Sequence, residues 1–237
     1  MLIGGVQKTT MLDFPGRVAC TVFTVGCNFR CPFCHNRELV SRKLWEESGR
    51  ELVDEGEFWK FLEKRRGVLD GVCITGGEPT LQPDLGEFCR KIKSLGLLVK
   101  LDTNGSNPDV VQKLLGDGLV DYVAMDYKVS SNTYQVISNN KEGKLAEKLR
   151  KSVELIVGSG VECEFRTTVV PRIHTEEVLR EMAGEITGRW IWQNFRAVNC
   201  LDRNWEEERS YSLEEIEGLR DRINRNVGLR GWGNLFT

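Results

Sequence analysis

Short apolar runs rich in β-branched residues alternate along the chain with longer amphipathic segments. The short runs predict strands at 18–24, 71–75, 97–102, 122–126, 162–170 and 190–195. The amphipathic segments predict helices at 53–66, 85–95, 109–115, 144–158 and 176–186. Strands that alternate with helices in this way are typical of successive βα units, so the sequence predicts an α/β fold around a parallel sheet.

Six βα units in 237 residues suit a partial, open (β/α)6 TIM-type barrel better than a closed barrel of eight strands. We expect one domain over 1–237, with its barrel core at about 18–195. A charged C-terminal extension follows at about 196–237. In it, Ser212 and Glu215 form a capping-box pattern that predicts a helix to about Arg225, and Trp205 and Trp232 could contact the barrel or a partner protein.

Polar motifs follow the first four predicted strands. A cysteine-rich loop at 27–36 follows the first strand, and Gly-Gly-Glu-Pro at 76–79 follows the second. Asp-Thr-Asn-Gly at 102–105 and Asp-Tyr-Lys at 126–128 follow the next two. Because parallel α/β folds place their chemistry at the carboxyl ends of strands, these motifs should share one rim.

Three closely spaced cysteines, Cys27, Cys31 and Cys34, carry the strongest chemical signal. Three thiolates without a fourth nearby cysteine suit a cubane cluster with one open iron. A structural zinc site would need a fourth ligand, and His35 lies directly beside Cys34, where it is poorly placed to turn back. A disulfide with an odd thiol is disfavoured because eight cysteines in 237 residues are too sparse for a disulfide scaffold, and we see no signal peptide.

The Cys-x3-Cys-x2-Cys run, with Phe33 before its last cysteine, resembles the signature of the radical S-adenosylmethionine enzymes. Segments 5–8, 13–16 and 22–36 resemble the activating proteins of anaerobic ribonucleotide reductase, whose close relatives are the pyruvate formate-lyase activating enzymes. The likeness runs from about residue 4 to at least 195. It implies a cytoplasmic oxidoreductase with one [4Fe-4S] cluster, held by the three cysteines, and S-adenosylmethionine.

The resemblance also implies a reaction and partners. The reduced cluster would cleave S-adenosylmethionine to methionine and a 5'-deoxyadenosyl radical, which takes hydrogen from a glycine of the partner enzyme. No catalytic residue beyond cluster and cofactor is needed. The expected partners are a glycyl-radical enzyme, in the first place anaerobic ribonucleoside-triphosphate reductase, and a low-potential electron donor such as flavodoxin or ferredoxin.

The resemblance further implies a set of cofactor-binding residues, namely Phe33, His35, Gly76, Gly77, Glu78, Pro79, Asp102, Thr103, Asn104, Asp126, Lys128 and Arg166. Gly-Gly-Glu-Pro would contact the amino group of S-adenosylmethionine, and Arg166 and Lys128 its carboxylate. Asp102, Thr103 and Asp126 would also help to hold a monovalent cation. Gln193 and Asn194 could add contacts near the ribose.

Each of these motifs also has an ordinary structural interpretation. Gly-Gly-Glu-Pro suits any strand-to-helix turn, and Asp, Asn and Gly are common turn residues. Lys128 could be solvated, and Arg166 could pack its stem and send its head to water. A non-catalytic iron-sulfur electron carrier would leave the motifs at 76–79 and 102–105 without a role. Activation of another glycyl-radical enzyme, of the pyruvate formate-lyase type, would use every cofactor motif.

The composition excludes some classes of partner but identifies no further chemistry. A formal net charge of -2 gives no electrostatic footprint for nucleic acid. No apolar stretch approaches the roughly 20 residues that span a bilayer, so we expect no membrane partner. Cys20, Cys73 and Cys89 lie in strand and helix patterns and predict small buried side chains. Cys163 and Cys200 are isolated, and none of the five forms the close-spaced set that a second cluster would need. His174 has no visible partner and is expected at the surface.

Overall fold

The computed structural model describes residues 1–134 and 144–232. Its single sheet has eight strands in the order of the sequence. They are β1 (Ile3–Thr10), β2 (Ala19–Thr24), β3 (Gly71–Gly76), β4 (Leu98–Thr103), β5 (Tyr122–Asp126), β6 (Glu162–Val169), β7 (Trp190–Asn194) and β8 (Gly228–Arg230). β1 runs antiparallel to β2, and every later pair is parallel. β1 and β8 end the row without pairing to each other within the described chain, so the barrel is open as expected.

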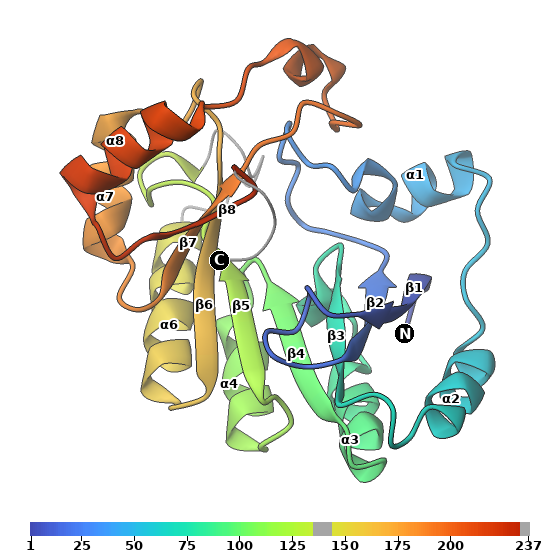
Figure 1. Ribbon diagram of the computed structural model, residues 1–237. Coiled ribbons are helices and arrows are strands. Elements are labelled where there is room, and N and C mark those ends of the chain that lie inside the picture. Colours follow the sequence, from blue (N-terminus) through green and yellow to red (C-terminus); the bar gives the residue numbers. More distant parts are fainter. Residues whose placement is uncertain (135–143, 233–237) are drawn as a thin grey trace.

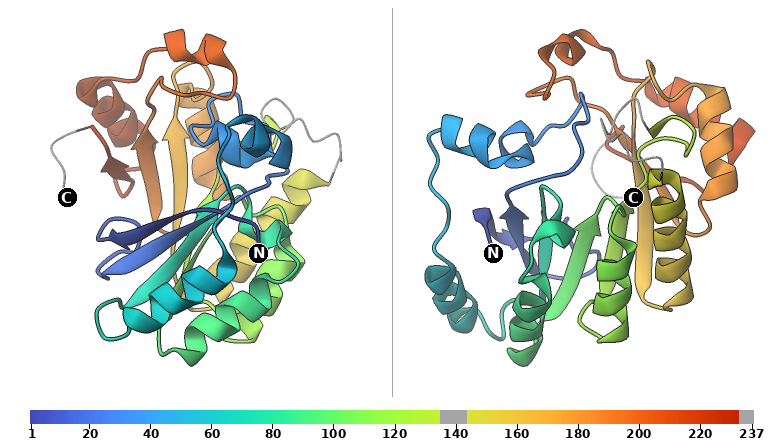
Figure 2. Two further views of the ribbon diagram at one scale, coloured as in Figure 1. Left: turned by 90° about the vertical axis from the view of Figure 1, so that its right-hand side faces the viewer. Right: turned by 180° about the vertical axis from the view of Figure 1, so that it is seen from behind.

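Helices cover the outer face of the curved sheet (Figures 1 and 2). The longer ones are α2 (Glu55–Lys64), α3 (Leu85–Ser94), α4 (Pro108–Gly116), α6 (Leu145–Gly158), α7 (Glu176–Glu185) and α8 (Leu213–Ile223). Shorter ones are η1 (Arg37–Val40), α1 (Arg42–Glu47), η2 (Pro79–Leu81) and η3 (Arg203–Glu207). None of the described helices has the length and apolar character to cross a membrane.

Alternation along the strands separates an apolar outer face from a polar interior. In β4, Val99 and Leu101 are buried in the main hydrophobic cluster together with Ile92 of α3. Lys100 and Asp102, which alternate with them, occupy the other face and are buried as well. Successive strand residues point to opposite faces, so every polar residue on the inner face enters the barrel. The interior of the barrel therefore contains buried charged side chains as well as apolar ones.

The predicted strands and helices are all present, with ends shifted by no more than two residues. The Ser212–Glu215 capping box is formed, and its helix ends at Ile223 rather than near Arg225. Six strands were too few, because β1 and β8 extend the sheet at both ends. β1 carries two glycines and three exposed polar residues, and β8 has only three residues, so neither has a strand's apolar pattern. The last part of the expected extension, 233–237, lies outside the described residues.

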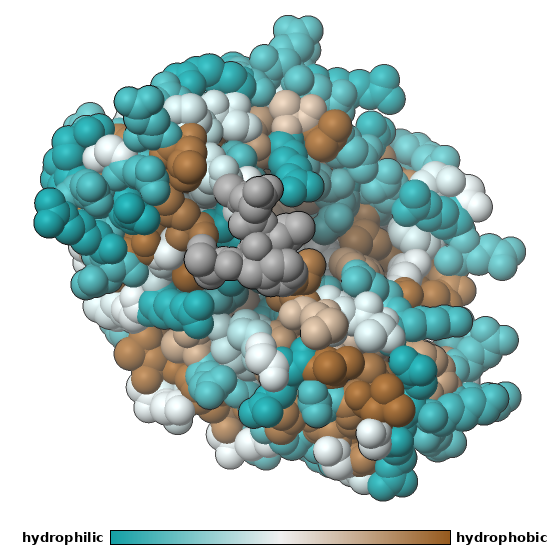
Figure 3. All heavy atoms as spheres, in the orientation of Figure 1, coloured by the Kyte–Doolittle hydropathy of each residue, from teal (hydrophilic) through white to brown (hydrophobic). Residues whose placement is uncertain are grey.

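The β1–β2 hairpin closes one side of the barrel interior. Phe14 from its loop is buried against Tyr122 of β5, with ring centroids 6.0 Å apart. Asp13 accepts a hydrogen bond of 2.6 Å from the Thr21 hydroxyl. Met11 and Leu12 at the tip remain exposed. Figure 3 shows brown apolar groups interspersed among hydrophilic side chains on this face of the molecule. The segment at 13–16 is thus part of the barrel's packing.

Candidate active site

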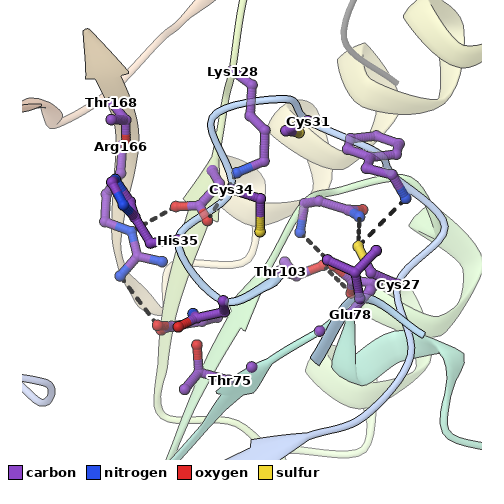
Figure 4. Close-up of a pocket in the computed structure, with 18 of the residues that line it drawn as sticks. Cys27, Cys31, Cys34, His35, Thr75, Glu78, Thr103, Lys128, Arg166 and Thr168 are labelled. Atoms are coloured by element: carbon purple, nitrogen blue, oxygen red, sulfur yellow. Dashed lines mark hydrogen bonds and ion pairs between the residues drawn. The ribbon is translucent and has the colours of Figure 1, made fainter. Parts of the chain in front are cut away.

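The carboxyl ends of the strands surround a pocket of about 280 Å³ (Figure 4). Fourteen of the fifteen residues expected at the site line it: Cys27, Phe33, Cys31, Cys34, His35, Gly76, Gly77, Glu78, Asp102, Thr103, Asn104, Asp126, Lys128 and Arg166. Gln193 lines it too, whereas Asn194 does not and instead donates to the Gly231 carbonyl. Of the fifteen, Pro79 is the one that does not line the pocket, because it is buried as the first residue of η2. The four motifs therefore do share one rim.

The three cysteines of the loop after β2 reach the pocket as free thiols. Burial raises the pKa of the Cys27 thiol to about 11 and that of Cys31 to about 12, and it raises the Cys34 pKa as well. Within the described chain, no three His, Cys, Asp or Glu side chains gather around one metal-ion position. A [4Fe-4S] cubane does not require such convergence, because each thiolate binds a different iron.

Backbone hydrogen bonds hold the cysteine loop from two sides. On one side, the Cys27 amide donates to the Val40 carbonyl at 2.9 Å. On the other, the Leu201 amide donates to the Cys34 carbonyl at 3.1 Å, and the Asp202 amide to the Pro32 carbonyl at 2.9 Å. The second set comes from the C-terminal extension, which crosses above the loop in Figure 1. The extension therefore contributes directly to the shape of the site.

Aromatic packing reinforces this contact. Trp205 is buried and its ring lies 5.8 Å from that of Phe33. His35 places its ring 5.7 Å from Phe195, and its Nδ1 lies 3.0 Å from the Val198 carbonyl. Phe33 and His35 thus join the cysteine loop to the extension while they line the pocket. Of the two interpretations that the sequence left open for Trp205, packing is the one observed.

Gly76 and Gly77 let the turn after β3 touch the start of the cysteine loop. Gly76 has φ +109°, a conformation that favours glycine. A Cβ on Gly77 would lie 2.1 Å from the Gly26 carbonyl oxygen, far inside contact distance. The Glu78 amide donates to that same oxygen at 2.7 Å. The paired glycines are therefore required for the close approach of two loops.

Glu78 is fully buried and joins the turns after β3 and β4. Its Oε1 accepts from the Thr80 amide and hydroxyl and from the Thr103 hydroxyl, at 3.1, 2.6 and 2.7 Å. Its Oε2 accepts from the Asn104 amide at 2.6 Å. Burial raises the Glu78 pKa, although these donors oppose the shift. Glu78 therefore fixes the pocket wall as well as presenting a carboxylate to it.

A row of alternating charges crosses the pocket floor from β4 to the segment after β5. Lys100 pairs with Asp102, and Arg166 of β6 bridges Asp102 and Asp126 at 3.1 and 2.8 Å. Lys128 completes the row at 3.3 Å from Asp126. Figure 4 shows Arg166 reaching into the pocket toward these carboxylates. The Arg166 guanidinium is therefore paired inside the barrel and does not point to bulk water. Lys128 is likewise not simply solvated, because its ammonium group pairs with Asp126.

Burial alone would raise the carboxylate pKa values in this row, but the neighbouring cations outweigh it. Arg166 and Lys100 lower the Asp102 pKa, and Arg166 and Lys128 lower that of Asp126 to about 2. Reciprocally, the carboxylates outweigh desolvation and raise the pKa of Arg166 and of Lys128. Asp102, Asp126, Arg166 and Lys128 are thus ionised at neutral pH.

Two buried side chains hold the backbone of Lys128. The Lys128 amide donates to the Tyr134 hydroxyl at 2.7 Å, and its carbonyl accepts from His174 Nε2 at 2.6 Å. His174 Nδ1 in turn accepts from the Val170 amide at 3.0 Å, which places the imidazole proton on Nε2. The expectation of a surface His174 was wrong, because its side chain is fully buried. Lys128 is therefore positioned by residues that no sequence motif revealed.

Comparisons with known proteins agree with this geometry. The family model described as "Radical SAM superfamily" matches residues 21–183. A Methanocaldococcus jannaschii protein, provisionally named glycyl-radical enzyme activating enzyme MJ1227, is 29% identical over 99% of this chain and 98% of its own length. The pyruvate formate-lyase-activating enzyme of Clostridium pasteurianum is 29% identical over 84% of this chain and 79% of its own.

Solved structures support the fold. Streptococcus suis SuiB bound to S-adenosylmethionine superposes with a TM-score of 0.60 at 16% identity. The match covers 90% of this chain and 50% of SuiB, so this chain spans about half of that larger protein.

Replacing Gly77 with Ala should displace the cysteine loop, because the added Cβ would collide with the Gly26 carbonyl. We expect the variant to bind much less iron per chain after anaerobic reconstitution, measured by iron and sulfide analysis. Gly86→Ala in α3 is the matched control, since nothing lies within 4 Å of its Cβ position. Equal iron content in the two variants would contradict this role of Gly77.

His174 should make stability depend on pH. Burial lowers its pKa from 6.5 to about 4, so between these values the unfolded chain binds the proton and the folded chain does not. The contribution of His174 to the free energy of unfolding should therefore be fully present above pH 6.5. It should fall by on the order of 3 kcal/mol as the pH drops through this window. Urea unfolding at several pH values measures it. His174→Gln, which has no titrating proton, should lose less; identical pH profiles would exclude His174 as the cause.

Proposed function

This chain belongs to the radical SAM superfamily, and from that premise we propose that it is a glycyl-radical-enzyme activase whose partner is anaerobic ribonucleoside-triphosphate reductase. The likeness to a provisionally named glycyl-radical enzyme activating enzyme carries the proposal, because it extends over 99% of this chain and 98% of that protein. We place the reaction in the cytoplasm, with a low-potential flavodoxin or ferredoxin as electron donor.

The residues of the pocket suit the superfamily's two cofactors, a [4Fe-4S] cluster and S-adenosylmethionine. Cys27, Cys31 and Cys34 would bind three irons, and no other cysteine lines the described pocket. When bound, these cofactors supply reductive cleavage of the sulfonium to methionine and a 5'-deoxyadenosyl radical that removes hydrogen from a glycine. The donor set thus fits a site-differentiated cluster with one iron left for the amino acid end of S-adenosylmethionine.

The chain's own residues would bind and orient S-adenosylmethionine. Lys128 and Arg166 bring two positive charges to the pocket, where they suit a carboxylate ligand. Glu78 offers a buried carboxylate at the opposite wall, where an ammonium group could be received. No general acid or base is needed, because the chemistry proceeds by hydrogen-atom and electron transfer. The protein's part is therefore to hold both ends of the cofactor and to exclude water.

The choice of partner is supported by the sequence outside the pocket. Segments 5–8 and 13–16 resemble the reductase activating proteins, and the chain lacks the ferredoxin-like insertion of some longer activases. The second candidate is activation of a pyruvate formate-lyase type of enzyme, which the 29% identity to the Clostridium pasteurianum activating enzyme favours.

An anaerobic assay separates these functions. The reconstituted and reduced protein is mixed with S-adenosylmethionine and, in parallel, with the co-encoded reductase or with a pyruvate formate-lyase. We expect 5'-deoxyadenosine by chromatography and a glycine-centred doublet on the reductase by electron paramagnetic resonance. A doublet only on the lyase would favour the second candidate. Deoxyadenosine without either doublet would exclude both, and absence of both products would favour the electron carrier.

Cys31→Ala should abolish the cluster and with it all cleavage of S-adenosylmethionine, because it removes one of three thiolate ligands. Cys89→Ala is the control, since Cys89 is equally buried but lies within the helix α3. We expect it to retain iron and activity at the cost of about 1 kcal/mol of stability for a lost buried group. Iron content and 5'-deoxyadenosine formation measure both. Full activity in Cys31→Ala would overturn the site assignment.

A further inference from the structure

Both carboxylates on the pocket floor are paired with cations of the chain itself. Asp102 pairs through Oδ1 with Lys100 and through Oδ2 with Arg166. Asp126 pairs through Oδ1 with Arg166 and through Oδ2 with Lys128. Each of the four carboxylate oxygens therefore already has a cationic partner.

The hydroxyl of Thr103 is engaged as well. It donates to Glu78 Oε1 at 2.7 Å and accepts from the Gly105 amide at 3.1 Å. Asp102, Thr103 and Asp126 are the three residues for which the family resemblance implies a monovalent cation. Their side chains do not fit that role here, because each candidate oxygen is already bound by another group.

Lys100 is the unusual member of this row. Its side chain is 2% exposed, and its Nζ lies 3.7 Å from Cys73 Sγ and 5.8 Å from the centre of the Tyr122 ring. Strand alternation places it on the same face of β4 as Asp102, two residues away. A buried ammonium group is stable only when it is paired, so Lys100 is committed to Asp102.

The charge balance of the row also suits an anionic ligand. The row holds three positive charges and two negative ones. Of the other acids near it, Glu164 is paired with Arg230 at 3.1 Å, and Glu78 is held by hydroxyl and amide donors. The row by itself therefore has one more positive than negative charge, which attracts an anionic group such as a carboxylate.

We propose that Lys100 is a positioning residue that takes the place of a monovalent cation beside Asp102, so that this chain binds S-adenosylmethionine without Na⁺ or K⁺. The proposal rests on the cofactors of the superfamily and not on the identity of the partner enzyme. Lys100 acts through Asp102, because it does not line the described pocket.

Equilibrium binding of S-adenosylmethionine to the cluster-containing protein tests the proposal without turnover. Titrations are made anaerobically in KCl, NaCl and tetramethylammonium chloride at equal ionic strength, since the organic cation is too large for a buried site. We expect the three dissociation constants to agree within about threefold. Binding that is weaker by more than this in the organic salt would overturn the proposal.

The same titrations with the variant Lys100→Met give a second test. Removal of the ammonium group leaves Asp102 Oδ1 unpaired, so binding should weaken about tenfold or more in the organic salt and recover in KCl or NaCl. Lys151→Met, which breaks an exposed pair with Asp109, should behave as the wild type. Lys100→Gln is measured beside Lys100→Met in case the latter folds poorly. The proposal fails if neither variant gains a dependence on the small cations, whereas the activase function is decided separately by the glycyl radical.

Discussion

The pocket depends on one electrostatic constraint, which is that charges inside a protein must be balanced at close range. The interior of this open barrel carries Lys100, Asp102, Arg166, Asp126 and Lys128 in a single row. Removing a member would take one ionic partner from its neighbours, and the cost would be largest at Lys100 and Asp102, the most buried members. Because the row spans β4, β5 and β6, it fixes how these strands present the loops that follow them. The same ion pairs therefore stabilise the barrel and set the geometry of the site.

A second coupling joins distant parts of the chain above this floor. The cysteine loop lies near the N-terminus, yet its carbonyls receive amides from Leu201 and Asp202, and its Phe33 packs on Trp205. On its other side, Gly77 allows the turn after β3 to approach Gly26. A loop of this length would otherwise sample many conformations, and fixing it in advance would reduce the entropy lost when the three cysteines bind the proposed cluster.

The sequence predicted what periodicity and short motifs encode. Each of the six predicted strands has a local apolar signal, Cys27 was selected by the spacing of the three cysteines, and Glu78 and Asp126 were selected by motifs that follow strands. β1 was missed because its pairing with β2, not its own pattern, makes it a strand. His174 was missed because its partner is a backbone carbonyl 46 residues away, which only the tertiary fold brings near. Lys100, like Arg166, interrupts an apolar run, and the same reasoning could have identified it.

The buried cysteine thiols place a further electrostatic constraint on the pocket. Burial raises their pKa values to about 11 and about 12 at Cys27 and Cys31, so each would remain protonated at neutral pH in the absence of iron. Binding of iron at these cysteines, as proposed above, would displace protons and bring negative thiolates into a buried site. Lys128 opposes the effect of burial at both thiols and is itself held by Tyr134 and His174. Lys128, the last member of the row, therefore lies where its charge acts both on Asp126 and on the thiols of the cysteine loop.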